Sequence, residues 1–400
     1  MLQRRYGMSK AVIAGWARTP FGRFMGSLSN VPATELGAVA LKGALERSGL
    51  TPDAVDYVIM GMVVQAGAGQ IPSRQATLKS GLPQSVPSDT LNKVCASGLR
   101  AVNMASMMIQ TGNASVMLAG GMENMSATPH LLEDGRSGYR MGNGKISDSM
   151  IKDGLWCPVY NVHMGVHGGK VPTSYGVTRE EADRWSLRSH QRAINAIDKN
   201  YFRDEIVPVQ VKEKKKELTV DTDELPRRDT AYEKLAALPP AFEKDGPVTA
   251  GNAPPISDGA AVLVVTSEEK ARELGLKIYA EIISHGVYSD DPSRIATVPE
   301  AAGRDALRKA GLKIEDIDLI EVNEAFAAVA RTCIRIGEWD EEIVNVNGGA
   351  VAIGHPIGAS GARILMTLIA ELHRRGGGHG MATICSGAAQ GEATIVKVLP

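Results

Sequence analysis

A cysteine at position 95 stands where a thiol could act as a nucleophile. Cys95 follows a strand-like stretch and precedes residues 96–100, where a helix is expected to begin. A thiol near the start of a helix meets the positive end of the helix dipole, which favours the thiolate. The sequence therefore predicts a lowered pKa and nucleophilic chemistry at Cys95, with a buried packing thiol as the alternative.

A single histidine lies in the most glycine-rich part of the chain. His355 precedes Pro356, and the surrounding glycines are Gly348, Gly349, Gly354, Gly358 and Gly361. Ordered glycines cost conformational entropy, so the cluster indicates sharp turns or close approach of the backbone to a ligand. A histidine held in front of the helix expected over 359–374 could meet an anionic or thioester ligand. A P-loop is excluded, because His355 and Pro356 occupy the positions of Lys and Ser or Thr; a solvated surface loop is the alternative.

Two more segments could supply polar groups. Cys385 ends a strand-like run that enters a small-residue turn, so this second thiol could move protons while the backbone N–H of Gly387 faces a developing oxyanion. Asn323 follows another expected strand and could hold a water or a carbonyl. The adjacent Glu324 is more simply explained as a charge in the first turn of a helix.

The elements that must position these groups form an internal repeat. Expected helices over 33–48 and 299–310 end at Gly49 and Gly311, and each is followed by an expected strand, over 55–60 and 317–322. Residues 96–100 match residues 359–363 at almost the same separation along the chain. Further strands are expected over 10–17 and 260–266. We therefore expect two similar α/β halves that face each other.

A segment of different composition separates the halves. Residues 126–247 are rich in charge, glycine and proline, include a charge run at 212–217 that suggests a solvated face, and contain one clear helix over 179–200. We interpret this segment as an inserted loop or lid domain. The predicted organisation is listed in chain order: the first part of the N-terminal half over 1–125, the insertion over 126–247, the completion of that half over 248–275, and the C-terminal half over 276–400. Met8 is the expected original start.

The composition is that of an ordinary soluble protein, and we expect a cytoplasmic enzyme. The 400 residues include 44 Lys and Arg against 45 Asp and Glu, so no nucleic acid partner is expected. No apolar run approaches the roughly 18 residues that span a bilayer, so no membrane partner is expected. The four cysteines show no C-x-x-C spacing, which disfavours a zinc site or a disulfide scaffold. Cys157 and Cys333 are expected to be packing residues.

Four motifs taken together carry a specific resemblance. They are, in chain order, Asn92-Lys-Val-Cys-Ala-Ser-Gly, Asn323-Glu-Ala-Phe, Gly354-His-Pro-Ile-Gly-Ala-Ser-Gly and Cys385-Ser-Gly. From Lys10 to the C-terminus the chain resembles the thiolase family, in particular bacterial acetyl-CoA C-acetyltransferases. The resemblance implies the α/β thiolase fold, five layers (αβαβα) built from two duplicated halves with an inserted loop domain.

The resemblance also assigns roles to individual residues. It implies that Cys95 takes the acetyl group as a thioester, that His355 activates Cys95, and that Cys385 moves the α-proton of the second acetyl thioester. One thioester oxygen would be bound by His355 and a water held by Asn323, the other by the N–H groups of Cys95 and Gly387. The implied reaction is the ping-pong condensation of two acetyl-CoA to acetoacetyl-CoA and CoA, or thiolysis of 3-ketoacyl-CoA, with no metal and no cofactor beyond the CoA thioesters.

The resemblance assigns the CoA-binding positions and the oligomeric state less completely than the catalytic residues. The matching CoA-binding positions are Leu155, His163, Met164, Arg227, Ala250 and Phe326. Two family serines are replaced by Lys234 and Pro254, and residues 166–170 depart from the usual pattern. Residues 128–149 resemble the region used for tetramer contacts, so a homodimer or homotetramer is expected.

Two rival functions make different demands on the same residues. A ketoacyl synthase on this fold pairs its cysteine with two histidines, whereas this chain has Asn323 and His355 at those positions together with a second cysteine. A non-catalytic acyl-CoA or lipid carrier predicts the loss of Cys95, His355 or Cys385, and all three are present. The sequence therefore favours a thiolase.

Overall fold

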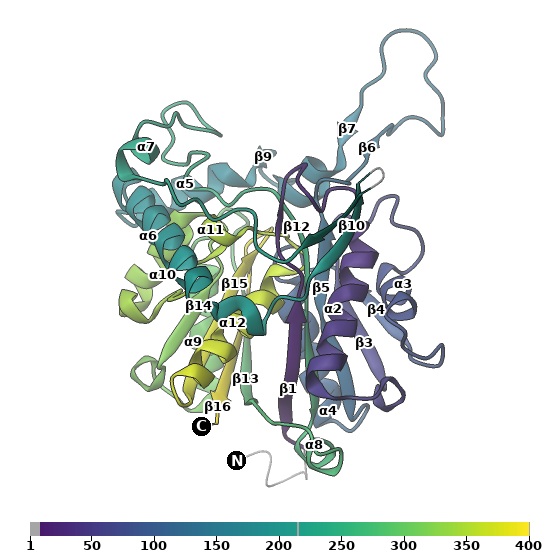
Figure 1. Cartoon of the computed structure of the whole chain (residues 1–400). Coiled ribbons are helices and arrows are strands. Elements are labelled where there is room, and N and C mark those ends of the chain that lie inside the picture. Colours follow the sequence, from purple (N-terminus) through teal and green to yellow (C-terminus); the bar gives the residue numbers. More distant parts are fainter. Residues whose placement is uncertain (1–8, 214–215, 400) are drawn as a thin grey trace.

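Two repeats of one strand-and-helix pattern make up most of the molecule (Figure 1). The computed structural model describes residues 9–213 and 216–399; the expected start at Met8 and part of the charge run at 212–217 lie outside them. The elements of the first half are β1 (Ala11–Arg18), β2 (Gly22–Arg23), α2 (Ala33–Ser48), η1 (Pro52–Ala54), β3 (Tyr57–Gly61), α3 (Pro72–Lys79), β4 (Ser88–Leu91), α4 (Ser97–Gln110), β5 (Val116–Asn124), β12 (Ser257–Ser267) and α8 (Glu268–Glu273).

The second half repeats this order. Its elements are β13 (Ala280–Ser289), α9 (Val298–Ala310), η4 (Ile314–Asp316), β14 (Leu319–Val322), α10 (Ala327–Gly337), η5 (Glu341–Ile343), α11 (Ala350–Ile353), α12 (Ser360–Arg374), β15 (Gly378–Ser386) and β16 (Gln390–Val398). The expected helices and strands of both halves are confirmed, with end positions shifted by at most three residues.

The strands of the two halves have equivalent partners. In the first half the order is β4-β3-β5-β12-β1, with β3 parallel to β4 and β5, and β12 antiparallel to β5 and β1. In the second half the order is β14-β15-β16-β13, with β14 parallel to β15, and β16 antiparallel to both β15 and β13. Within the described residues, the strands of the two halves pair where β1 meets β13, at Val12 with Glu281 and at Ile13 with Ala280.

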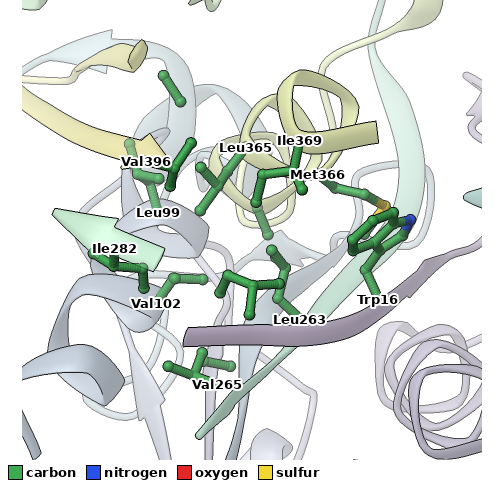
Figure 2. Packing of buried hydrophobic residues seen from close by; sticks show 14 of the residues in the cluster. Trp16, Leu99, Val102, Leu263, Val265, Ile282, Leu365, Met366, Ile369 and Val396 are labelled. Carbon is green, nitrogen blue, oxygen red and sulfur yellow. The ribbon is translucent and has the colours of Figure 1, made fainter. Parts of the chain in front are cut away.

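Helices α4 and α12 form a layer between the two halves. Figure 2 shows Leu99 and Val102 of α4 beside Leu365, Met366 and Ile369 of α12, facing apolar strand residues from both halves. Gly98 and Gly361 occupy matching positions of the repeat and permit this approach, because a Cβ on either would lie 2.9 Å or less from a backbone nitrogen of the other helix. The repeated Ala-Ser-Gly segment is therefore the contact point of the two helices.

Two outer helix layers complete the architecture. Helix α2 covers the outer face of the first half, and α9 and α10 cover the outer face of the second half. Gly49 and Gly311 end α2 and α9 with φ values of 72° and 71°, the left-handed conformation that glycine adopts without strain. The order of layers is helix, sheet, helix, sheet, helix, as expected.

The segment between β5 and β12 spreads over one end of both halves (Figure 1). Its elements are β6 (His130–Leu131), β7 (Ser147–Asp148), η2 (Met150–Leu155), β8 (Trp156–Cys157), β9 (Val162–His163), α5 (Met164–Ser174), α6 (Arg179–Asp198), η3 (Tyr201–Asp204), β10 (Val209–Glu213), β11 (Lys216–Val220) and α7 (Tyr232–Ala236). Helix α6 begins with a capping box between Thr178 and Glu181 and packs on α10 and α11. Within the described residues, no helix is long and apolar enough to cross a membrane.

Candidate active site

A cavity of about 480 Å³ opens between the inserted segment and the two halves. Ten of the eleven predicted site residues line it: Cys95, Leu155, His163, Met164, Arg227, Ala250, Phe326, His355, Cys385 and Gly387. The eleventh, Asn323, is fully buried, and its Nδ2 lies 3.5 Å from Nε2 of His355. Residues that are far apart in the sequence therefore meet at one site.

Cys95 lies in a strained turn between β4 and α4. The preceding residue, Val94, has φ of 45°, which is unusual for a β-branched side chain. The turn is held by the side chain of Asn92, which accepts from the Val94 N–H at 2.9 Å, and by Ser97, which accepts from the Lys93 N–H at 2.8 Å. This turn presents the sulfur of Cys95 to the cavity.

The prediction that Cys95 has a lowered pKa is wrong. Burial raises the pKa of the Cys95 thiol to about 12, and the nearby Glu123 carboxyl acts in the same direction. Hydrogen bonds from the N–H groups of Cys95 and Gly387 to the sulfur lower the pKa, but by less. A helix dipole is worth about 1 kcal/mol near its end, less than one pKa unit, whereas burial can shift a pKa by about 3 to 5 units. Cys95 is therefore a neutral thiol until a base removes its proton.

The raised pKa of the Cys95 thiol predicts the pH range in which it loses its proton. Because the pKa is near 12, the thiolate fraction should be negligible at neutral pH and should rise only above about pH 10. The measurement is the ultraviolet thiolate absorbance of the wild-type protein minus that of the Cys95→Ser variant, followed against pH. A thiolate signal already present at pH 7 would contradict a neutral resting thiol.

His355 is held so that one ring nitrogen can act as a base. Its Nδ1 lies 2.6 Å from Oγ of Ser360, whose only hydroxyl hydrogen is donated to the Pro356 carbonyl at 2.9 Å. Ser360 therefore accepts from Nδ1–H, which leaves the lone pair on Nε2. Burial, assisted by Arg363, lowers the pKa of His355 to about 3, so the ring is neutral at physiological pH.

Two glycines allow the backbone conformation and close packing of the loop that carries His355. Gly354 has φ of 109°, and a Cβ there would lie 2.4 Å from the Leu225 side chain. A Cβ on Gly358 would lie 2.6 Å from the Met122 carbonyl, and its N–H donates to the buried Glu123 at 3.1 Å. The glycine cluster thus serves a tightly packed interior loop, and the alternative of a solvated surface loop is wrong.

Cys385 lies near the end of β15 and lines the same cavity as Cys95. It is 2% exposed and pairs in register with Gly391 of β16. Burial raises the pKa of the Cys385 thiol well above its ordinary value, and Cys95 contributes in the same direction because it is close by. The turn that follows places the Gly387 N–H on the Cys95 sulfur. Both sulfurs and a backbone donor therefore face the same space.

Glu324 is not a first-turn charge, contrary to the sequence-based expectation. It is fully buried, and α10 begins only at residue 327. Four donors converge on its two carboxylate oxygens: Nε1 of Trp185 at 2.8 Å, Oγ of Ser189 at 2.8 Å, Nδ2 of Asn345 at 3.0 Å and N of Val351 at 3.0 Å. Glu324 thus joins α6 of the inserted segment to the second half and supports the position of Asn323 beside it.

Removing this carboxylate should strongly destabilise the fold. The variant Glu324→Ala leaves four donors buried without an acceptor, so the free energy of unfolding should fall by about 3 to 5 kcal/mol. Urea unfolding measures the change, with Glu315→Ala, at an exposed carboxylate of η4, as the matched control. A loss below about 1 kcal/mol would show that the donors find other partners.

The predicted CoA-binding residues all line the cavity. His163 stacks on Phe242 with ring centroids 4.3 Å apart, and its Nδ1 accepts from the Gly165 N–H. Arg227 is a cationic group in the cavity lining. Pro254 also lines the cavity, whereas Lys234 is exposed on the surface and pairs with Asp229 at 2.8 Å.

Some residues of the site could not be singled out from the sequence. Ser360, which orients His355, is the first residue of α12, and its place in the helix start was the only signal. The apolar wall includes Val94, Met125, Met150, Ile256, Ile295 and Ile357, which are indistinguishable from core residues in the sequence. Within residues 9–213 and 216–399, no group of three or more His, Cys, Asp or Glu side chains is arranged to hold a metal ion. The four cysteines are free thiols, and Cys157 and Cys333 are buried, as expected.

Comparison with known proteins matches both halves of the chain to one family. The family model for the thiolase N-terminal domain matches residues 11–269, and the model for the thiolase C-terminal domain matches residues 276–398. An acetyl-CoA acetyltransferase of Pseudomonas aeruginosa is 50% identical over 387 residues, which are 96% of this chain and 98% of that protein. A probable acetyl-CoA acetyltransferase of Escherichia coli is 47% identical over 98% of this chain and 99% of its own length.

A solved structure extends the similarity to the fold. The crystal structure of the Bacillus anthracis acetyl-CoA acetyltransferase superposes with a TM-score of 0.96 at 43% identity, covering 98% of this chain and 99% of that one. The predicted thiolase fold is confirmed by this match. Since the family models cover both halves and relatives of this identity span nearly the entire chain, the protein belongs to the thiolase family.

Proposed function

We propose that the protein is an acetyl-CoA C-acetyltransferase. It condenses two acetyl-CoA to acetoacetyl-CoA and CoA, or cleaves 3-ketoacyl-CoA in the reverse direction, through an acetyl-Cys95 intermediate. The observation that carries the proposal is the meeting of Cys95, Cys385 and the unprotonated Nε2 of His355 in one cavity, with the Gly387 N–H on the Cys95 sulfur. The names of the similar proteins support the same activity.

In the first step Cys95 exchanges with CoA. Nε2 of the neutral His355 takes the Cys95 proton as the sulfur attacks the thioester carbonyl, so that the thiolate forms only when it is used. The N–H groups of Cys95 and Gly387 donate to the developing oxyanion, and a single donor of this kind contributes about 3 to 4 kcal/mol. The carbon–sulfur bond to CoA then breaks, and His355 returns the proton to the CoA sulfur.

In the second step Cys385 acts on the methyl group of another acetyl-CoA. His355 takes the Cys385 proton, and the Cys385 thiolate removes the α-proton; its raised pKa makes it a strong base. The enolate oxygen receives hydrogen bonds from His355 and from a water held by Asn323, whose Oδ1 has no hydrogen-bond partner within the described residues. The enolate carbon attacks acetyl-Cys95, and the departing Cys95 sulfur takes the proton from His355.

The proposal also covers cofactor use and CoA binding. The reaction uses no cofactor beyond its CoA thioester substrates. The CoA portion is bound by Leu155, His163, Met164, Arg227, Ala250 and Phe326. Because two reduced thiols are required, we place the enzyme in the cytoplasm. Its acyl-CoA substrates place it in fatty acid metabolism.

The protein assembles as a homodimer or homotetramer. Contact with other copies is supported by exposed apolar side chains around the β6–β7 segment, namely Leu132, Met141 and Ile146.

An assay of condensation tests the proposal against its rivals. Acetyl-CoA alone should yield acetoacetyl-CoA and free CoA, and acetoacetyl-CoA with CoA should be cleaved. Preference for a malonyl thioester would instead indicate a ketoacyl synthase, and binding of acyl-CoA without turnover would indicate a carrier. Thiolysis rates across 3-ketoacyl-CoA of increasing length then define the chain-length preference.

A further inference from the structure

An ion pair joins the two segments of the fold that carry the cysteines. Lys93 lies two residues before Cys95, and its Nζ is 2.6 Å from Oε2 of Glu392. Glu392 lies on β16 and pairs in register with Ile384, the residue before Cys385. The ion pair therefore connects the nucleophile turn of the first half to the β15–β16 hairpin of the second half.

The backbone and side chains around Lys93 also contact the β15–β16 hairpin. The Lys93 carbonyl accepts from Oγ of Ser386 at 2.6 Å. The Val94 side chain lies against Gly387, where an added Cβ would be 3.3 Å from the two Val94 methyl groups. Ser386 directly follows Cys385 and Val94 directly precedes Cys95, so a shift of Lys93 would move one sulfur relative to the other.

Glu392 is fixed from a second direction. Its side chain is fully buried, and its Oε1 accepts from Nδ2 of Asn103 at 2.8 Å and lies 3.5 Å from Nη1 of Arg100. Both residues belong to α4, the helix that starts behind Cys95. A buried carboxylate with this many directed partners is geometrically constrained. Neither Lys93 nor Glu392 lines the cavity, so the pair acts through the residues that do.

We propose that Lys93 and Glu392 form a positioning clamp, which sets the separation of the Cys95 and Cys385 sulfurs and aligns the Gly387 N–H with Cys95. The inference rests on the acetyl transfer proposed above, in which both sulfurs must reach one acetyl group. A misplacement of about 1 Å at reacting groups can cost about 10²-fold in rate. The clamp therefore affects the chemical step and leaves CoA binding unchanged.

The test compares rates per acetylated enzyme. Lys93→Met removes the ammonium group and keeps an apolar stem of similar length. With acetyl-CoA in deuterated water, mass spectrometry should show α-hydrogen exchange per acetylated Cys95 slowed by about 10- to 100-fold, with KM for acetyl-CoA unchanged. Lys93→Arg keeps the positive charge and should recover most of the rate. Unfolded molecules carry no acetyl group, so this ratio does not respond to loss of folded protein.

Matched variants separate positioning from stability. Lys10→Met breaks another ion pair between the halves, Lys10 with Glu281 at 2.9 Å, and should leave exchange per acetylated enzyme unchanged. Lys93→Met combined with Glu392→Gln should be no slower than the slower single variant, because the two residues act as one unit. If Lys93→Met only lowers the melting temperature and exchange per acetylated enzyme stays normal, the clamp is overturned. Failure of the wild-type protein to become acetylated would instead contradict the proposed function.

Discussion

Replacing Cys95 with serine should abolish formation of the acetyl-enzyme. The base facing this position is a neutral His355 with a pKa near 3, which can assist a thiol but is too weak to activate a hydroxyl group. Loss of an enzyme's nucleophile costs up to about 10⁶-fold in turnover, and a fall of about 10⁴- to 10⁶-fold is expected here. Radioactive acetyl-CoA measures the intermediate directly as label retained on the denatured protein.

A buried cysteine that does not line the cavity provides the control for this variant. Cys333 is fully buried, and its Sγ contacts the Ala296 carbonyl at 3.3 Å, a hydrogen bond that a serine hydroxyl can also make. Cys333→Ser should therefore retain stoichiometric labelling. Stoichiometric acetylation of Cys95→Ser would remove Cys95 from its role as nucleophile.

Replacing Cys385 with serine should separate the two steps of the reaction. Cys95, His355 and the Gly387 N–H remain in place, so the variant should still acquire one acetyl group. The thiol that removes the α-proton is absent, and positioned acid–base groups contribute about 10²- to 10⁴-fold, so α-hydrogen exchange and condensation should fall by this factor. Deuterium incorporation into acetyl-CoA and radioactive labelling of the protein are measured on the same preparation.

The two cysteine variants give different patterns, which makes their comparison decisive. Cys95→Ser should lose both labelling and condensation, whereas Cys385→Ser should lose only exchange and condensation. Normal exchange in Cys385→Ser would assign the α-proton to another base. Loss of labelling in that variant would show that Cys385 is required for the first step as well.

Much of the molecule was determined by the sequence itself. The ends of α2 and α9 at Gly49 and Gly311 were predictable, because a left-handed backbone after a helix is a local property that glycine satisfies. The repeat was visible because both halves bury helices and strands with the same period. The reactive residues were recognisable because Cys95, His355 and Cys385 are unusual residue types within short, small-residue turns.

Only the tertiary structure decided the properties that depend on distant segments. The pKa of Cys95 is raised because distant segments pack around its side chain and bury it, and this burial outweighs the local helix start. From the sequence, Glu324 is expected to be a first-turn charge. Its buried role depends on Trp185 and Ser189, hydrogen-bond donors on α6, which is remote in sequence. Burial and charge pairing arise from what packs around a residue, whereas helix ends and turns arise from the residues themselves.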